Sequence, residues 1–302
     1  MFEHEISNDL EEYYKTLGNS KIRNIIKYST EGGKCIRGFI VKHIINTLSP
    51  YNIHYWEPIV CVELLHSSSL IIDDLPCMDN DTTRRGKLST FVAFGERQAI
   101  VSSLYLVSES LKILFNSLNK FRMVLKEADP NFNLEDQINL VNKLINEWSV
   151  LLGKNLIIGQ MLDLKEDVEK LLNVKIPEKN SDKLIMIYKT CSLFMFCFVV
   201  GAIFCGKINY KIIDEFKQMG LHFGIMFQIM DDFKDINEDI HNYNYVLENG
   251  KQKALHAYID SRTKLFFLLK KHNLDTTKFK TLITKIDSYI PTMLEVNMSP
   301  LR

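Results

Sequence analysis

Apolar residues recur along this chain at steps of three and four positions, which places them on one face of an α-helix. We find no run of alternating strands joined by Asn-Gly or Asp-Gly turns, the pattern expected of β-hairpins. The stretches with helical spacing are residues 22–45, 59–72, 100–115, 140–164, 184–204, 212–233 and 254–269. The pattern therefore predicts an all-α protein of about ten helices.

The breaks between these stretches are short and contain turn-forming residues, at 47–51, 128–133, 176–182 and 288–291. No segment is long or polar enough to be a domain linker, and no repeat of fixed period is present. With 302 residues, the chain is long enough to bury a large core. We therefore expect one domain that spans residues 1–302.

Composition narrows the possible functions. Lys plus Arg equals Asp plus Glu, at 37 each, so the chain has no basic excess for binding nucleic acid. Six cysteines, none in a Cys-x-x-Cys pair, favour reduced thiols and a cytoplasmic location. The uncharged stretch from Thr190 to Gly206 is slightly short for a membrane span. We expect a core helix there and no transmembrane segment.

Two acidic clusters each follow a strongly apolar helical stretch. Pro76 cannot continue a regular helix, so the chain should turn there and bring the end of the first cluster back towards its start. In the second cluster, Asp231 and Asp235 share one helix face with Gln228. The candidate metal ligands are Asp73, Asp74 and Asp79 in the first cluster and Asp231, Asp232 and Asp235 in the second.

Carboxylates in small numbers, with room for water and phosphate, suit Mg²⁺, and sets of Cys and His that would bind zinc are absent. The alternative for each cluster is an ordinary solvated acidic turn. Cations near the clusters favour a site for two diphosphate groups, because arginine binds phosphate with two hydrogen bonds and lysine acts as a point charge. These residues are Lys34, Arg37, His66, Arg84, Arg85 and Lys189, with the hydroxyl of Thr190 beside the last.

In these motifs the chain resembles the trans-isoprenyl diphosphate synthase family over roughly residues 31–254. The matching segments, in the family's order, are Glu63-x-x-His66, Ser69-Leu70-Ile71-Ile72-Asp73-Asp74, Met78-Asp79-Asn80-Asp81, Arg84-Arg85-Gly86-Lys87, Phe94-Gly95-Glu96, Gly159-Gln160-x-x-Asp163-Leu164, Lys189-Thr190, Gly201-Ala202 and Phe227-Gln228-Ile229-x-Asp231-Asp232-x-x-Asp235. The resemblance implies the isoprenoid synthase fold, a single helical bundle around a central cavity. It also implies a homodimer.

The resemblance further implies roles for the candidate residues. The six aspartates would bind Mg²⁺ against the diphosphate of an allylic substrate. Isopentenyl diphosphate would bind to Lys34, Arg37, His66 and Arg85, and Arg84 would contact the allylic diphosphate. Residues Lys189, Thr190 and Gln228 would line the allylic site near the developing cation. The implied reaction is ionisation, condensation and elimination, with Mg²⁺, Arg84 and Lys189 stabilising the departing diphosphate.

The chain departs from the family's pattern at several positions. Gly38 replaces a proline, Ser103-Leu104 replaces Gly-Asp, and Cys191 replaces a glycine. The segment after Asp235 is shorter than in the family and lacks its lysines, and Asn244-Tyr245-Val246 stands in place of its Thr-Tyr-Pro element. These differences indicate a divergent member, of the kind seen in large DNA viruses.

Product length should depend on Ser68 and Ser69, one turn before the first aspartates. In the family, a bulky aromatic residue at the position of Ser68 stops growth of the product early. Because serine is too small to do so, we expect a product of about C20 or longer, with geranylgeranyl diphosphate favoured. Residues Leu104, Tyr105 or Ser108 could form the floor of the cavity instead.

Two other functions fit parts of the pattern. A non-catalytic partner subunit of an active synthase would show the same motifs, although such subunits tend to lose aspartates and this chain keeps all six. A terpene cyclase of similar fold needs only one diphosphate site, and the second set of cations argues against it. Elongation of an allylic diphosphate separates the synthase from both alternatives.

Overall fold

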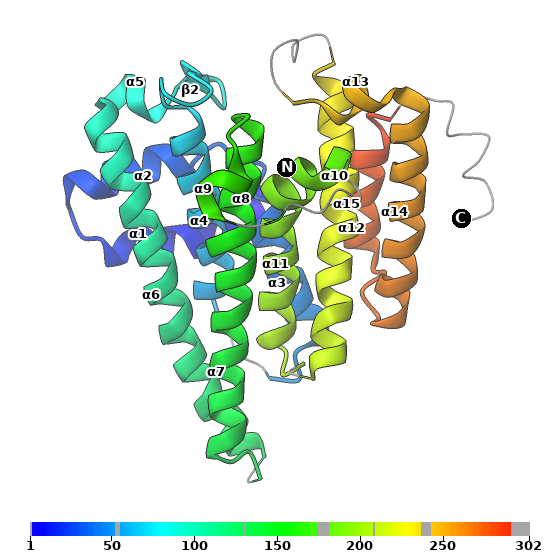
Figure 1. The fold of residues 1–302 in the computed structure, drawn as a ribbon. Helices are drawn as coiled ribbons and strands as arrows, with labels where there is room; N and C mark the ends of the chain where they lie inside the picture. The colour runs from blue at the N-terminus through cyan, green and yellow to red at the C-terminus, as the bar shows by residue number, and fades with distance from the viewer. Residues whose placement is uncertain are drawn as a thin grey trace. The chain divides into compact units, whose positions relative to one another are not determined.

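In this computed structural model, residues 2–51, 55–129, 131–173, 175, 181–207, 209–236 and 243–290 are described, the side chains of 181 and 182 excepted. Within these residues the protein is helical apart from one short two-stranded hairpin, which confirms the all-α prediction (Figure 1). Fifteen α-helices are described, and ten of them have at least ten residues.

The elements are α1 (Glu3–Thr16), α2 (Lys21–Thr30), α3 (Ile36–Leu48), α4 (Glu57–Asp73), β1 (Thr83–Arg84), β2 (Lys87–Leu88), α5 (Thr90–Phe94), α6 (Glu96–Ala128), α7 (Leu134–Trp148), α8 (Ile157–Asp163), α9 (Val168–Leu172), α10 (Ser181–Ile185), α11 (Ser192–Ile203), α12 (Tyr210–Lys234), α13 (Tyr245–Asn249), α14 (Lys251–Lys271) and α15 (Thr277–Asp287). Two π-helical segments, η1 (Ser149–Leu156) and η2 (Met186–Cys191), join α7 to α8 and α10 to α11. The predicted stretch at 22–45 is divided by a turn at Glu31–Gly32 into α2 and α3. The break expected at 176–182 lies mostly outside the described residues.

The chain divides into two compact units. Unit 1 comprises residues 1–142 and 200–206, and unit 2 comprises residues 143–199 and 207–302. Each unit is described by itself below. The single domain spanning residues 1–302 stays a prediction.

The centre of unit 1 is α4, which packs against α1, α2, α3 and α6. This helix is apolar on nearly every side, and Val60, Cys61, Val62 and Leu64 are fully buried. Burial of this kind supplies most of the stability of a helical unit, because propensity alone contributes little. The first acidic cluster therefore begins at the end of a rigid, buried helix.

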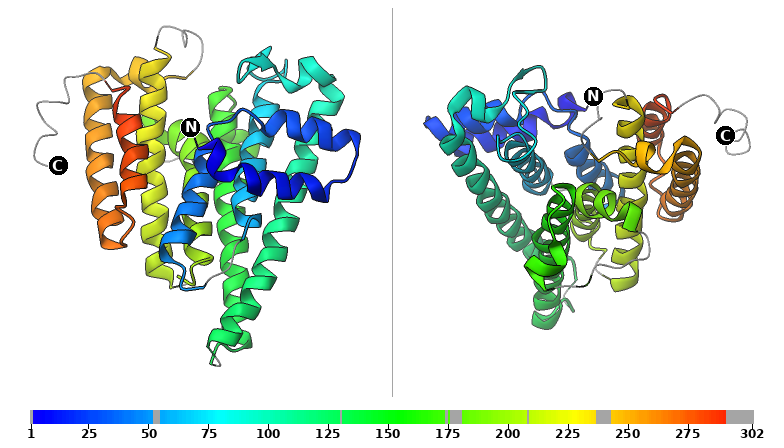
Figure 2. Two further views of the ribbon diagram at one scale, coloured as in Figure 1. Left: turned by 180° about the vertical axis from the view of Figure 1, so that it is seen from behind. Right: turned by 45° about the horizontal axis from the view of Figure 1, so that its top comes forward.

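The centre of unit 2 is the helix α11 together with α12. Phe194 and Phe198 of α11 pack against Phe223 of α12, with ring centroids 5.0 and 6.2 Å apart. Phe279 of α15 closes this aromatic cluster at 6.1 Å from both Phe198 and Phe223. In unit 2 the helices α12, α14 and α15 run side by side (Figures 1 and 2).

Two helical stretches in the described residues, 96–128 and 183–203, are long and apolar enough to cross a membrane by length and composition. The core helix of a soluble protein passes the same test, and 72% of the apolar window within 183–203 is buried. The uncharged stretch is accordingly a core helix, as the sequence predicts, and neither helix gives clear evidence of a membrane span.

Candidate functional site

In unit 1 the first acidic cluster forms a tight turn at the end of α4. The backbone N–H of Asp79 donates to the carbonyl of Asp73 at 2.9 Å, and that of Asn80 donates to the carbonyl of Leu75 at 3.1 Å. The chain thus folds back after Pro76, as the sequence predicts. The side chain of Asp79 is exposed and that of Asp73 is half-buried, so both are accessible to a ligand.

Asp74 differs from its neighbours because it is buried and already paired. Only 2% of it is exposed, and its Oδ1 accepts from Nε of Arg84 at 2.8 Å and from Nη2 of the same guanidinium. Nη2 also donates to Asp81 at 2.7 Å. The two residues predicted to bind metal and phosphate at this point are therefore bonded to each other, which fixes the guanidinium beside the turn.

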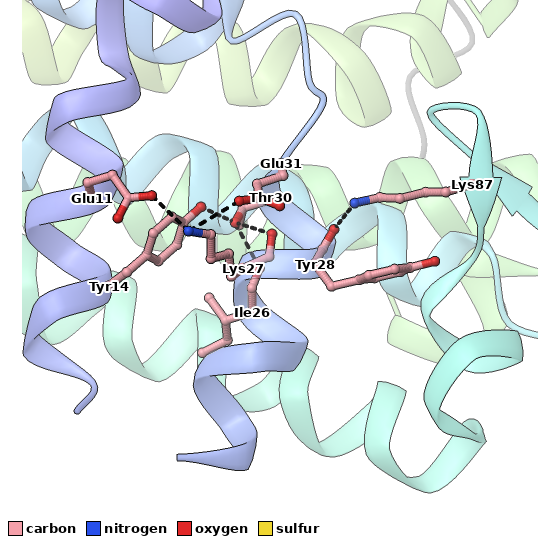
Figure 3. A network of polar contacts seen from close by, with 8 residues as sticks. All are labelled: Glu11, Tyr14, Ile26, Lys27, Tyr28, Thr30, Glu31 and Lys87. Atoms are coloured by element: carbon pink, nitrogen blue, oxygen red, sulfur yellow. Dashed lines mark hydrogen bonds and ion pairs between the residues drawn. The ribbon is translucent and has the colours of Figure 1, made fainter. Parts of the chain in front are cut away.

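The hairpin formed by β1 and β2 docks onto the last turn of α2. The Nη1 atom of Arg85 donates to the carbonyls of Ser29 at 2.9 Å and Thr30 at 3.0 Å. Lys87 donates to the carbonyl of Tyr28 (Figure 3), and the hydroxyl of Tyr28 donates back to the carbonyl of Leu88 at 2.7 Å. Two cations thus satisfy carbonyls that a helix leaves without partners at its end.

The other end of this network joins α2 to α1 (Figure 3). The hydroxyls of Tyr14 and Thr30 lie 2.5 Å apart, and Lys27 pairs with Glu11 at 2.9 Å and with Glu31 at 3.5 Å. The lysine and both carboxylates are well exposed, so these ion pairs contribute little. The buried contact between the two hydroxyls therefore holds α2 in place more firmly than the ion pairs do.

Further candidates in unit 1 lie on α4 and on the loop before α3. Burial lowers the pKa of His66 well below its ordinary value, and the charges of Arg37, Arg85 and Arg84 act in the same direction. The imidazole is therefore neutral at neutral pH. Lys34 is exposed on the loop between α2 and α3, and Arg37 is half-buried in the first turn of α3.

The two residues predicted to set product length, Ser68 and Ser69, differ in burial and in hydrogen-bond partners. Ser68 is buried, and its Oγ lies 2.8 Å from Oγ of Ser103 and donates to the carbonyl of Ser103 at 3.1 Å. The Oγ of Ser103 in turn donates to the carbonyl of Ser68 at 3.2 Å. Ser69 is half-buried and bonds within α4 to the carbonyl of His66. Ser68 thus belongs to a direct contact between α4 and α6.

In unit 2 the second acidic cluster lies at the end of α12 and is linked to η2 through Gln228. The hydroxyl of Thr190 donates to Oε1 of Gln228 at 2.5 Å, and Nε2 of Gln228 donates to Asp232 at 2.7 Å. Because one amide atom accepts and the other donates, the orientation of the Gln228 side chain is fixed. The structure thus joins three predicted residues in one hydrogen-bonded chain.

Asp232 is buried and also holds the start of α13. Its Oδ2 accepts from the backbone N–H of Tyr245 at 2.8 Å, and its backbone carbonyl accepts from Nδ2 of Asn244 at 3.0 Å. Asp231 and Asp235 are half-buried, and Asp235 pairs with Lys234 at 2.7 Å. The Asn244–Val246 segment, where the family has another element, is thus attached directly to the second acidic cluster.

Lys189 is placed by residues that sequence reasoning did not assign to it. Its Nζ pairs with Asp163 at 2.5 Å. Gly159, one turn earlier on α8, lies so close to η2 that a Cβ atom would be 2.2 Å from the backbone N of Lys189. The motif that contains Gly159 and Asp163 marks this segment in the sequence, but its spacing does not show that Lys189 is the residue it contacts.

The donor chemistry of both clusters fits Mg²⁺. In the part of the chain that the structure describes, no three carboxylate, imidazole or thiol groups gather as a complete metal cage. Mg²⁺ usually keeps several waters and binds one or two carboxylates together with substrate phosphates, so it does not need such a cage. Of the six aspartates predicted to bind metal, Asp73 and Asp79 in unit 1, and Asp231 and Asp235 in unit 2, are more accessible than the buried Asp74 and Asp232.

Comparison with known proteins gives a consistent result. Residues 19–257 match the family described as polyprenyl synthetase. Farnesyl diphosphate synthase of Micrococcus luteus is 30% identical over 283 residues, covering 88% of this chain and 89% of that protein. Geranylgeranyl pyrophosphate synthase 10 of Arabidopsis thaliana is 29% identical over 220 residues, covering 72% of this chain and 58% of that protein.

The chain is also similar in fold to a solved structure. It is a geranyltransferase from Helicobacter pylori complexed with magnesium and isoprenyl diphosphate. The TM-score is 0.69 at 20% identity, with 94% of this chain and 96% of that chain covered. The fold is the all-α isoprenoid synthase fold. The chain belongs to the polyprenyl synthetase family, whose members are trans-isoprenyl diphosphate synthases.

Proposed function

We propose that this protein condenses isopentenyl diphosphate with dimethylallyl, geranyl and farnesyl diphosphates, as a trans-prenyltransferase that uses Mg²⁺. One observation carries the proposal: the first acidic cluster folds into a turn with Asp73 and Asp79 accessible and with the Arg84 guanidinium fixed beside them. Carboxylates for a metal and a cation for phosphate thus occupy one turn. The family assignment agrees with this chemistry.

Each predicted residue has a role in the proposal. Mg²⁺ binds to Asp73, Asp79, Asp231 and Asp235. The other two aspartates of the motifs, Asp74 and Asp232, are buried and hold neighbouring groups in place by hydrogen bonds. Mg²⁺ supplies positive charge to the departing diphosphate. The substrate-binding residues are Lys34, Arg37, His66 and Arg85 for isopentenyl diphosphate and Arg84 and Lys189 for the allylic diphosphate.

Thr190 and Gln228 act beside the allylic carbon in this proposal. The Thr190 hydroxyl donates its hydrogen bond to Oε1 of Gln228, which leaves the oxygen lone pairs of Thr190 for the developing cation. Dipoles fixed in advance stabilise such charge without having to reorient. The double bond of isopentenyl diphosphate attacks the cation, and the proton that leaves afterwards goes to the pyrophosphate product. No side-chain nucleophile is required.

We propose geranylgeranyl diphosphate as the product, because the position that a bulky aromatic residue occupies in short-chain enzymes is Ser68. The relatives include both farnesyl and geranylgeranyl diphosphate synthases, so product analysis must decide between C15 and C20. We also propose a homodimer. Exposed apolar side chains on unit 1 support it, namely Val101 and Leu104 of α6 and Leu134 and Ile138 of α7. We also propose that the protein is cytoplasmic.

The test is to incubate the protein with Mg²⁺, isopentenyl diphosphate and each of the three allylic primers, and to identify the products by mass spectrometry. Elongation that disappears with EDTA and returns with added Mg²⁺ is the expected result. The longest product then decides between C15 and C20. Absence of elongation with every primer would refute the proposal and favour a non-catalytic partner subunit.

A further inference from the structure

The loop between α2 and α3, residues 31–35, contains Lys34 and leads into Arg37. A loop that binds diphosphate loses affinity if it must first be ordered, so groups that hold it in advance matter for binding. In unit 1 this loop lies between two helix ends, the last turn of α2 and the first turn of α3. Each end is bonded to a charged side chain from elsewhere in the chain.

At the end of α2 the charged side chains are cationic. Arg85 and Lys87 donate to the carbonyls of three consecutive residues, Tyr28, Ser29 and Thr30. The Lys87 ammonium also lies 4.1 Å from the centre of the Tyr28 ring. A cation at a helix C-terminus is favoured by the helix dipole. The hairpin thus fixes the point at which the loop begins.

At the start of α3 the bonded side chain is a buried carboxyl group, that of Glu63, and its burial raises its pKa. The N-cap residue Cys35 has a left-handed backbone with φ of 51° and provides no side-chain cap. Instead, Oε1 of Glu63 on α4 accepts from the backbone N–H of Gly38 at 2.7 Å. Glu63 is only 4% exposed. A carboxylate is favoured at a helix N-terminus, and a hydrogen bond to a charged group is among the stronger ones.

Gly38 is suited to this contact in two ways. A proline, which the family usually has here, has no N–H to donate to Glu63. A Cβ atom at Gly38 would lie 2.9 Å from Cδ1 of Ile6 and 3.1 Å from Cγ of Glu63, so the space beside the bond is filled. The departure from the family at this position therefore coincides with a bond that the family's usual residue cannot form.

We propose that Glu63 and Lys87 are positioning residues, which hold the 31–35 loop and Arg37 in the conformation that binds isopentenyl diphosphate. This inference rests on the proposed function. Neither residue needs to touch substrate. The buried carboxyl group of Glu63 is bonded to backbone, and the primary amine of Lys87 is bonded to the carbonyl of Tyr28.

The chain offers a matched control on the same helix. Glu57 of α4 is also 4% exposed and is bonded to Lys120 at 2.5 Å. It caps no part of the 31–35 loop. Glu57→Gln therefore replaces a buried carboxyl group of α4 by an amide in the same way as Glu63→Gln, without acting on the loop.

The experiment compares the KM values for the two substrates in Glu63→Gln, Lys87→Met and Glu57→Gln. We expect Glu63→Gln and Lys87→Met to raise the KM for isopentenyl diphosphate about tenfold, which corresponds to about 1.4 kcal/mol of binding. The KM for the allylic primer should change less than twofold. In Glu57→Gln both values should stay near those of the unaltered protein. A parallel change in both KM values, or the same change in Glu57→Gln, would overturn the inference.

A binding measurement keeps the inference testable apart from activity. Calorimetry with inorganic pyrophosphate, without Mg²⁺, should show affinity about tenfold weaker in Glu63→Gln and Lys87→Met and unaltered in Glu57→Gln. If the unaltered protein binds pyrophosphate but elongates no primer, the proposed function fails while the positioning inference is judged on the binding data alone. Equal pyrophosphate affinity in all four proteins would refute the inference even in an active enzyme.

Discussion

Replacing Gly159 by alanine should damage the protein because α8 and η2 are in backbone contact there. An added Cβ would lie 2.2 Å from the backbone N of Lys189 and 2.6 Å from the backbone carbon of Tyr188. These atoms cannot rotate away as a side chain can. To reach even 3.0 Å, below which real Cβ contacts essentially never occur, the two elements must separate by about 0.8 Å.

That separation has two measurable consequences. Overpacking of this kind costs about 1–3 kcal/mol of unfolding free energy. It also moves Lys189 relative to its partner Asp163, and a shift of about 1 Å in a catalytic group can lower the rate about a hundredfold. We therefore expect a loss of about 1–3 kcal/mol in chemical denaturation and a fall in turnover of one to two orders of magnitude in the elongation assay.

Gly153→Ala is the matched control. Gly153 lies in η1, and a Cβ there would meet only the carbonyl of Trp148 at 4.0 Å. Because nothing obstructs the methyl group, alanine should leave stability unchanged or raise it by about 0.4–1 kcal/mol. If Gly159→Ala unfolds at the same denaturant concentration as Gly153→Ala and turns over equally fast, the reasoning from backbone contact is wrong.

Three further changes test the chemistry of unit 1. The folded-state pKa of His66 lies below its unfolded value of about 6.5, so as the pH falls the unfolded chain takes up a proton first and the free energy of unfolding decreases below pH ~6.5. Urea denaturation at pH 7.5 and 5.5 should show a smaller decrease in His66→Gln than in the unaltered protein, and equal decreases would contradict this. Ser68→Ala should cost about 1 kcal/mol because Ser103 loses a partner, and the cost should not add to that of Ser103→Ala in a double-mutant cycle. Arg84→Ala should lower the unfolding free energy by about 1–3 kcal/mol, because the buried Asp74 carboxylate loses its guanidinium partner. Adding Asp74→Asn to this variant should restore much of the lost stability. No recovery would show that the unpaired carboxylate is not the cause of the loss.

The sequence predicted those features that follow from local pattern. The buried helix that ends at Asp73 is an uninterrupted apolar run, and Pro76 has only one local consequence, a turn. Helix α1 escaped prediction because acidic residues are interspersed among its apolar ones, although Ile6 and Tyr13 are fully buried. An element with so many charges is recognised as a packed helix only when its partner helices are known.

Contacts between distant residues could not be predicted in the same way. Asp74 and Arg84 were both expected to bind ligands, and their bond to each other depends on how the hairpin docks. Ser103 was visible only as a departure from the family, and its pairing with Ser68 requires the crossing of α4 and α6. Spacing identifies which residues share a face, but three-dimensional packing decides which side chain on another helix they meet.

The π-helical turns have a consequence for how this chain tolerates insertion and deletion. A π-turn bonds each residue to the fifth before it rather than the fourth, so it contains one residue more than an α-helical turn and is frequent at functional sites. In η2, Lys189 reaches Asp163 on α8 while its neighbour Thr190 reaches Gln228 on α12. Removing one residue from Met186–Cys191 would give this segment ordinary α-helical spacing and change the directions in which Lys189 and Thr190 point. Length in this segment is therefore under stricter constraint than amino-acid identity, and lineages that diverge in sequence here should still conserve the number of residues.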